Sequence, residues 1–230
     1  MSPRSDGPLD ITTVFLYCAP TTADEASALM LRAVKAHLAL DGVGLFDEDD
    51  QRTLDRPDGL APEWKKKPVF LTDAQSAHAI VLHHFWQAGS PYHYLAIGPD
   101  SDVESSELEQ EWRVLTTRAA KVLAALAPDL ATGFAQRPEA EADPVHYGTL
   151  CSDASTRVLT PWTFIGSKRA DDRTRQRIAA LPGASVTSIA DGVLINAVSV
   201  PGTAPDPQFL AALKAMGKID YVDPLLEKSS

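Results

Sequence analysis

In the stretch PWTFIGSKRADDRTRQRIAALPGASVTSIADGVLINAV, residues 161–198, strand and helix signals alternate, and their order indicates the fold class. Its first segment, Trp162–Ile165, is aromatic and β-branched, which is typical of a buried strand. Asp171 or Asp172 then caps a helix, because a carboxylate before a helical segment accepts hydrogen bonds from free amide groups. The helix ends at Pro182-Gly183, since proline cannot continue it.

The rest of this stretch predicts a hairpin, and the residues that follow it predict a last helix. Residues 184–189 and 193–198 alternate on either side of Asp191-Gly192, a dipeptide typical of tight hairpin turns. Pro205-Asp206-Pro207 opens the helix that follows. The order β-α-β-β-α builds an antiparallel sheet with helices packed on one face, as in ferredoxin-like domains.

The first half of the chain shows the same order, with one further short strand after its first helix. It contains a strand at 11–18, a helix from Thr21 or Thr22 to Leu40, a short strand at 42–46, a hairpin of strands at 77–86 and 92–97, and a helix from Ser105 or Ser106 to Pro128. The segment from Asp47 to Lys67 is predicted to be a long surface loop. We therefore expect an α+β protein of two ferredoxin-like halves, 1–134 and 161–230, joined by an irregular connection, 135–160, in one compact unit.

The predicted core follows the inner faces of these segments. It consists of Val14, Leu16, Leu29, Ala33, Leu82, Leu95, Trp112, Leu115, Ile165, Ile178, Leu194, Ile195 and Leu213.

Composition narrows the classes of partner. The 230 residues carry a formal net charge of −10, which disfavours binding to nucleic acid phosphates and is compatible with a basic protein partner. The sequence contains no run of 18 apolar residues, so no membrane-spanning helix is predicted. Its first residues lack the apolar stretch of a secretory signal. We therefore expect a cytoplasmic protein that binds neither membrane nor nucleic acid. The cysteines, Cys18 and Cys151, form no pair with metal-ligand spacing.

Motifs for catalysis are missing from the sequence. There is no GxSxG nucleophile elbow, no GxGxxG and no phosphate-binding GxxxxGK[ST]. A binding protein needs only a shaped surface, so we expect no enzyme activity, no catalytic residue and no cofactor.

Four histidines leave an alternative open. His78, His83, His84 and His93 fall on the predicted hairpin, and imidazoles together with a carboxylate are suitable zinc or iron ligands. No carboxylate lies inside these strands, and the spacing lacks a rigid ligand pair. The main interpretation is solvent-facing histidines; the alternative is a metal site at His78, His84 and His93, or an acid–base enzyme centred on the cluster.

Two acidic segments are candidate partner-binding surfaces. The first is the run Asp47-Glu48-Asp49-Asp50, which lacks the order of a calcium loop, together with Trp64. The second comprises Asp100, Asp102 and Glu104, just before the helix that ends at Pro128. Carboxylates arranged in this way favour a basic partner and speed its association.

Three short motifs of the second half resemble the immunity protein 52 family. They are Thr160–Gly166, the strand pair around Asp191–Ile195, and Tyr221-Val222-Asp223-Pro224. The resemblance implies an antitoxin of bacterial polymorphic toxin and type VI secretion systems. Such a protein binds a cognate toxin, typically a nuclease and here expected to be basic, and blocks it without catalytic residues of its own.

Overall fold

The computed structural model describes residues 7–17, 32, 45–47, 52–54, 69–73, 80–85, 93–99, 101–138, 158–217 and 219–226. Its helices within these ranges are α2 (Leu108–Leu126), α4 (Asp172–Ala179) and α5 (Pro207–Met216). Its strands are β1 (Pro8–Tyr17), β2 (Leu45–Asp47), β3 (Arg52–Leu54), β4 (Val69–Asp73), β5 (Ile80–Phe85), β6 (His93–Pro99), β7 (Val103–Glu104), β8 (Leu130–Gln136), β9 (Val158–Leu159), β10 (Trp162–Ile165), β11 (Ser185–Ile189), β12 (Gly192–Asn196) and β13 (Asp220–Tyr221).

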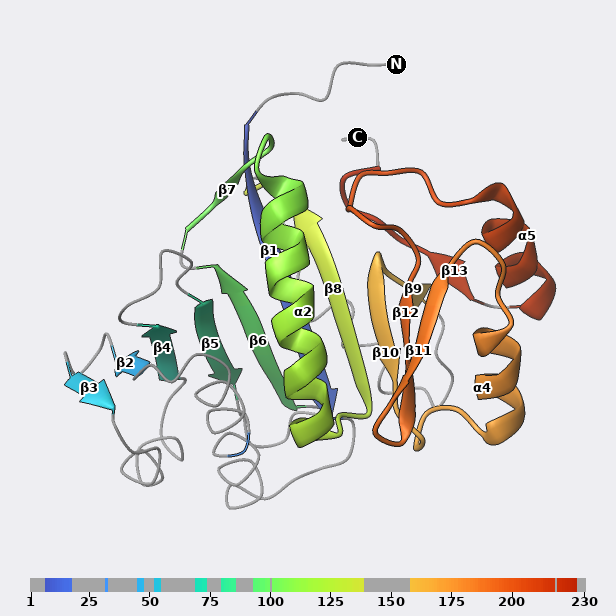
Figure 1. Ribbon diagram of the computed structural model, residues 1–230, viewed down its shortest axis with the longest axis horizontal. Coiled ribbons are helices and arrows are strands. Elements are labelled where there is room, and N and C mark those ends of the chain that lie inside the picture. The colour runs from blue at the N-terminus through green and yellow to red at the C-terminus, as the bar shows by residue number, and fades with distance from the viewer. Residues whose placement is uncertain are drawn as a thin grey trace.

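A single antiparallel sheet runs through both halves of the chain (Figure 1). Its strand order is β11-β12-β10-β8-β1-β6-β5-β4-β2-β3, and β7 pairs with the start of β1. Strands β9 and β13 form a small parallel pair apart from it. The halves are joined by the pairing of β8 with β10, from Leu130 beside Ile165 to Gly133 beside Trp162. The predicted α+β class is confirmed.

Each half contains a split β-α-β unit, in which a helix connects two parallel strands and an antiparallel strand lies between them. In the second half, α4 connects β10 to β11 with β12 between them. In the first half, α2 connects β6 to β8 with β1 between them. The complete ferredoxin-like halves are not confirmed, because β13 pairs with β9 and the place beside β10 is taken by β8.

The described helices cover both faces of the sheet, in contrast to the predicted single face. Buried residues of α2 cluster with Ile11 and Phe15 of β1, whereas those of α4 and α5 cluster with Val14 and Leu16. Successive residues of a strand point to opposite faces, so the two clusters lie on opposite sides. The physical reason is handedness: both crossovers advance along the sheet in the same direction but start from antiparallel strands, so right-handed connections place their helices on opposite faces.

Three details of the predicted elements need correction. The loop predicted from Asp47 to Lys67 contains the end of β2 and all of β3. The connection predicted to be irregular from residue 135 begins with the end of β8, whose seven residues are all buried. The residue that precedes α2 is Glu107, not the predicted Ser105 or Ser106, and its side chain makes no capping hydrogen bond. The Ser105 hydroxyl donates instead to the Gly7 carbonyl oxygen at 2.7 Å.

The second half follows the prediction closely. Asp171 caps α4, and its Oδ1 accepts a hydrogen bond of 2.7 Å from the Thr174 amide. Asp171 interacts both with the side chain and with the amide of Thr174. These two interactions, the first being the larger, lower the pKa of Asp171 below its usual value. The hairpin turn consists of Ala190, at φ +50°, and Asp191, whereas Gly192 lies in β12. Gly192 is required there because an added Cβ would lie 2.4 Å from the Ile165 carbonyl oxygen.

Most of the predicted core is confirmed. Its buried members are Val14, Leu16, Trp112, Leu115, Ile165, Ile178, Leu194, Ile195 and Leu213. Leu29 and Ala33 lie outside the described residues, and for Leu82 and Leu95 only the backbone, in β5 and β6, is described.

Leu115 lies in the middle of the buried face of α2, with 2% of its surface exposed. We expect Leu115→Ala to lower the free energy of unfolding by about 2–5 kcal/mol, because it leaves a cavity between helix and sheet. Urea denaturation measures this loss, with the exposed Lys121→Ala on the same helix as control. A loss for Leu115→Ala no larger than that of the control would contradict the observed packing.

Candidate partner-binding surface

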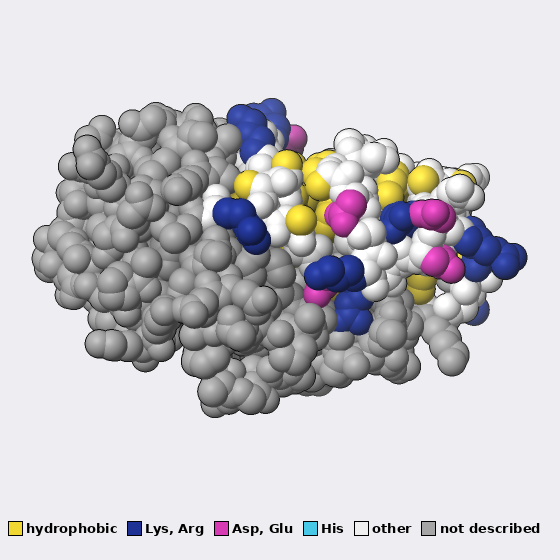
Figure 2. Space-filling view, turned by 90° about the horizontal axis from the view of Figure 1, so that it is seen from below, with side chains coloured by type: hydrophobic (Ala, Val, Ile, Leu, Met, Phe, Trp, Pro, Cys, Tyr) yellow, Lys and Arg dark blue, Asp and Glu magenta, His cyan; other side chains and the backbone are white. Residues whose placement is uncertain are grey.

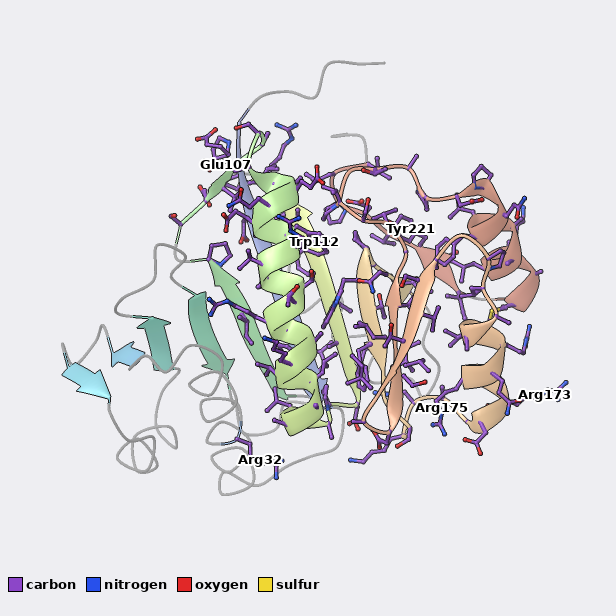
Figure 3. The ribbon with its side chains drawn as sticks, in the orientation of Figure 1. Arg32, Glu107, Trp112, Arg173, Arg175 and Tyr221 are labelled. Atoms are coloured by element: carbon purple, nitrogen blue, oxygen red, sulfur yellow. The ribbon has the colours of Figure 1, made fainter. Side chains whose placement is uncertain are left out.

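The segment that leads into α2 concentrates negative charge at one end of the sheet. Five carboxylates lie within residues 102–111: Asp102, Glu104, Glu107, Glu109 and Glu111. The first four are exposed, and Figure 3 shows Glu107 at the start of the helix. Carboxylates are stabilised there by the positive end of the helix dipole, so the helix tolerates this density of charge.

Backbone pairing with β1 and the hydrogen bond from the Ser105 hydroxyl to Gly7 hold this acidic segment in place. In β7, Glu104 pairs with Pro8 and Val103 with Leu9 of β1, and Val103 is buried. The Glu107 amide donates to the Glu104 carbonyl oxygen at 2.8 Å, which closes a turn between strand and helix. The acidic side chains therefore project from a fixed backbone.

A hollow of about 440 Å³ lies beside the acidic segment and is lined from both halves of the chain. The start of α2 contributes Ser105, Ser106, Leu108 and Glu109, and the connection between β12 and α5 contributes Ser199, Val200 and Thr203. Hydroxyl groups and one carboxylate predominate among these side chains. The hollow could receive a polar or cationic side chain of a partner, and its size is within the range of small-ligand pockets.

The buried carboxylate of Asp223 fixes the 199–203 side of the hollow. Its Oδ2 accepts a hydrogen bond of 2.7 Å from the Gly202 amide, and its Oδ1 accepts one of 3.1 Å from the Leu225 amide. Gly202 has φ +77°, a conformation that other residues rarely adopt, and an added Cβ would lie 3.3 Å from the Leu225 side chain. The closing Tyr-Val-Asp-Pro motif is therefore an anchor for this loop.

Tyr221 completes the anchor. Its hydroxyl donates to Asp223 Oδ2 at 3.4 Å, and its ring meets Phe209 of α5 edge to face. Burial, followed by the negative charge of Asp223, raises the pKa of Tyr221 well above its usual value. The phenol therefore remains protonated and keeps its hydrogen-bond donor throughout the physiological pH range.

The opposite end of the sheet has a different charge pattern. Figure 2 shows this lower end, where dark blue Lys and Arg side chains lie beside carboxylates. Lys168 forms an ion pair of 3.4 Å with the buried Asp129, and Arg175 pairs with Asp172 at the start of α4. Lys168 and Arg175 at this end are thus engaged in ion pairs, whereas Glu107 and its exposed neighbours present carboxylates to solvent at the other end.

The predicted site residues fall in separate places. Asp102 and Glu104 are exposed in the acidic segment, as expected for a contact surface. Asp47 lies at the end of β2, with its backbone paired to Arg52 and Leu71. Four strand spacings separate β2 from β1 along the sheet, about 19 Å. Glu48, Asp49, Asp50, Trp64 and Asp100 lie outside the described residues.

The histidine alternative concerns strands of which only the backbone is described. His83 and His84 belong to β5, and His93 belongs to β6, where it pairs with Tyr17. His78 lies outside the described residues. In the described part of the chain, no group of three or more His, Cys, Asp or Glu side chains is placed to hold a metal ion. None of the described helices has the length and apolar character needed to cross a bilayer.

Sequence reasoning missed the second wall of the hollow. Ser199 and Thr203 belong to no motif, and nothing in the sequence predicts that they lie near Ser105. Glu107, Glu109 and Glu111 are visible in the sequence as helix-stabilising charges, and the density of carboxylates at the start of this helix is the signal that indicates the acidic surface.

No protein-family model and no curated protein matches the chain. Among solved structures, the fold is similar to that of the Pseudomonas aeruginosa T6SS protein PA0821, with a TM-score of 0.51 and 14% sequence identity. The similarity covers 91% of this chain and 73% of that chain. At this identity the comparison establishes a common fold, and the name of that neighbour connects it with the T6SS.

The role of Asp223 can be tested by removing its carboxylate. We expect Asp223→Ala to lower the free energy of unfolding by about 1–3 kcal/mol, because the Gly202 and Leu225 amides lose their acceptor. Hydrogen exchange of the amides at 199–203 should become faster, whereas Tyr221→Phe, which keeps the carboxylate, should change both quantities less. Unaltered exchange in Asp223→Ala would show that the loop is held by other contacts.

Proposed function

We propose that this protein is a cytoplasmic immunity protein that binds a cognate toxin of a type VI secretion system and blocks it by occlusion. The observation that carries the proposal is the acidic end of the sheet. Exposed carboxylates from 102–109 lie there beside a hollow that both halves of the chain line. The fold similarity to a protein named as a T6SS protein supports the same class.

Charge specifies the kind of toxin. A nuclease needs a basic cleft to hold phosphates, and a surface with Asp102, Glu104 and Glu109 offers carboxylates in their place. The chain's net charge of −10 adds long-range attraction to a basic partner. The toxin that fits best is therefore a basic nuclease, and inhibition requires only that its cleft be covered.

The proposal is tested by producing the toxin encoded beside this gene in bacterial cells, with and without this protein. We expect growth arrest without the protein and growth with it, together with a stable complex of the two purified proteins. Absence of both protection and binding would refute the immunity function.

The acidic surface is tested by reversing charge at two of its members. We expect Glu104→Lys/Glu109→Lys to slow association with the toxin by more than about tenfold at low salt, with a smaller effect at high salt. Stopped-flow or surface-plasmon-resonance measurements at several ionic strengths give these rates.

A matched control exists elsewhere in the chain. Asp172→Lys/Asp220→Lys makes the same change in net charge, and it too replaces one first-turn helix carboxylate and one strand carboxylate. If the two double variants slow association equally, net charge alone acts and the acidic end is not the contact surface.

A further inference from the structure

Strand β11 forms one edge of the large sheet, and among the described residues no strand is hydrogen-bonded to its outer side. Figure 1 shows it at the end of the sheet next to α4. The side chains of Ser185, Thr187 and Ser188 are exposed, and those of Val186 and Ile189 are half-buried. Side chains along this strand are thus exposed or half-exposed to solvent.

The pairing with β12 defines which backbone groups face outward. Ala190 and Asp191 form a two-residue turn, so the closing pair, Ile189 with Gly192, exchanges hydrogen bonds. In an antiparallel ladder such pairs alternate, so Ser185, Thr187 and Ile189 direct their backbone groups to β12. Val186 and Ser188 direct theirs outward, where they have no hydrogen-bond partner in the described part of the chain.

Features that usually protect an edge strand are missing from β11. Its sequence, Ser-Val-Thr-Ser-Ile, has no charged residue and no proline, and each of its five residues has a single partner on β12, so no bulge interrupts it. Natural sheets block edge pairing with charges, prolines, bulges or short edges. An uncharged, regular edge with free donors and acceptors is suited to pairing with another extended strand.

We propose that β11 pairs antiparallel with β11 of a second copy of this chain, so that one sheet continues through a two-fold symmetric dimer. A symmetric register about Thr187 sets Val186 opposite Ser188 of the second copy, and Ser188 opposite Val186. These are the residues whose backbone groups face outward, so both pairs exchange hydrogen bonds. The edge is complementary to itself in the sense that an isologous interface requires.

Side chains and flanking charges are compatible with this register. Thr187 lies opposite its own copy in a non-hydrogen-bonded pair, where β-branched residues make favourable contacts. Asp191 of one copy lies opposite Gly183 of the other, just after α4, whose last turn carries Arg177. The paired residues themselves, 185–189, carry no charged side chain, so no like charges meet within the paired segment.

The full-length protein tests the inference by sedimentation velocity over a range of concentrations. We expect a reversible dimer that tightens as salt increases, because each copy carries a net charge of −10 and salt screens their repulsion. Thr187→Lys and Thr187→Glu should each weaken the dimer by more than about tenfold, because like charges then face each other. An equimolar mixture of the two variants should form a one-to-one heterodimer.

A second pair of variants tests the backbone contacts separately. Ser188→Pro removes an outward N–H and leaves the ladder to β12 intact, so it should give a folded monomer, as checked by circular dichroism. Ser188→Ala keeps that N–H and should still dimerise. A wild-type protein that remains monomeric at every concentration, or a dimer that all these variants leave unchanged, would overturn the inference. Neither outcome bears on whether the protein neutralises a toxin.

Discussion

The helices and the two halves of the sheet are organised around the close approach of α2 to strand β8 at Gly133. All seven residues of β8 are buried, between β1 on one side and β10 on the other. A Cβ at Gly133 would lie 3.1 Å from the ring of Trp112 and 3.2 Å from the Cβ of Trp162. Glycine at this position leaves room for the Trp112 ring against the sheet while Trp162 packs beside it, edge to face with Phe15 at 6.4 Å.

This contact connects the halves as well as the layers. Trp112 belongs to α2, Gly133 to the last described strand of the first half, and Trp162 to the first strand of the large sheet in the second half. Because β8 and β10 pair here, the start of α2 and the connection after β12 lie close enough to line one hollow. Val200 and Leu225 pack against the same core cluster as α2, so the candidate partner surface rests directly on the core.

Local chemistry decided which elements could be predicted from the sequence. The α4 cap at Asp171, the hairpin of β11 and β12, and the buried face of α2 each depend on neighbours in sequence, and all are confirmed. Strand β8 was missed because Leu-Ala-Thr-Gly-Phe-Ala-Gln has few β-branched residues; its small side chains suit a position covered on both faces. The distribution of helices over two faces depends on strand order, which no local pattern contains.

The same limit applies to the candidate site. Asp102 and Glu104 could be selected because charge before a helix is visible in sequence, whereas Ser199 and Thr203 become neighbours of Ser105 only through the pairing of β8 with β10. Asp223 was noticed as part of a motif, but its role needs the Gly202 amide 21 residues away. A single sequence can show such a residue, but it does not show the long-range contacts through which the residue acts.

The acidic end is suited to electrostatic attraction, whereas the free edge of β11 is suited to backbone hydrogen bonding. The two surfaces lie at different places on the sheet. Carboxylates act on a partner over about a Debye length of 8–10 Å, whereas backbone pairing acts only at hydrogen-bond distance. In an antiparallel dimer the two-fold axis is perpendicular to the sheet, so the two copies run in opposite directions. Their acidic ends then point away from each other, which lowers the repulsion between two chains of net charge −10. Each acidic end remains open, so self-association through β11 and binding of a basic partner are geometrically compatible.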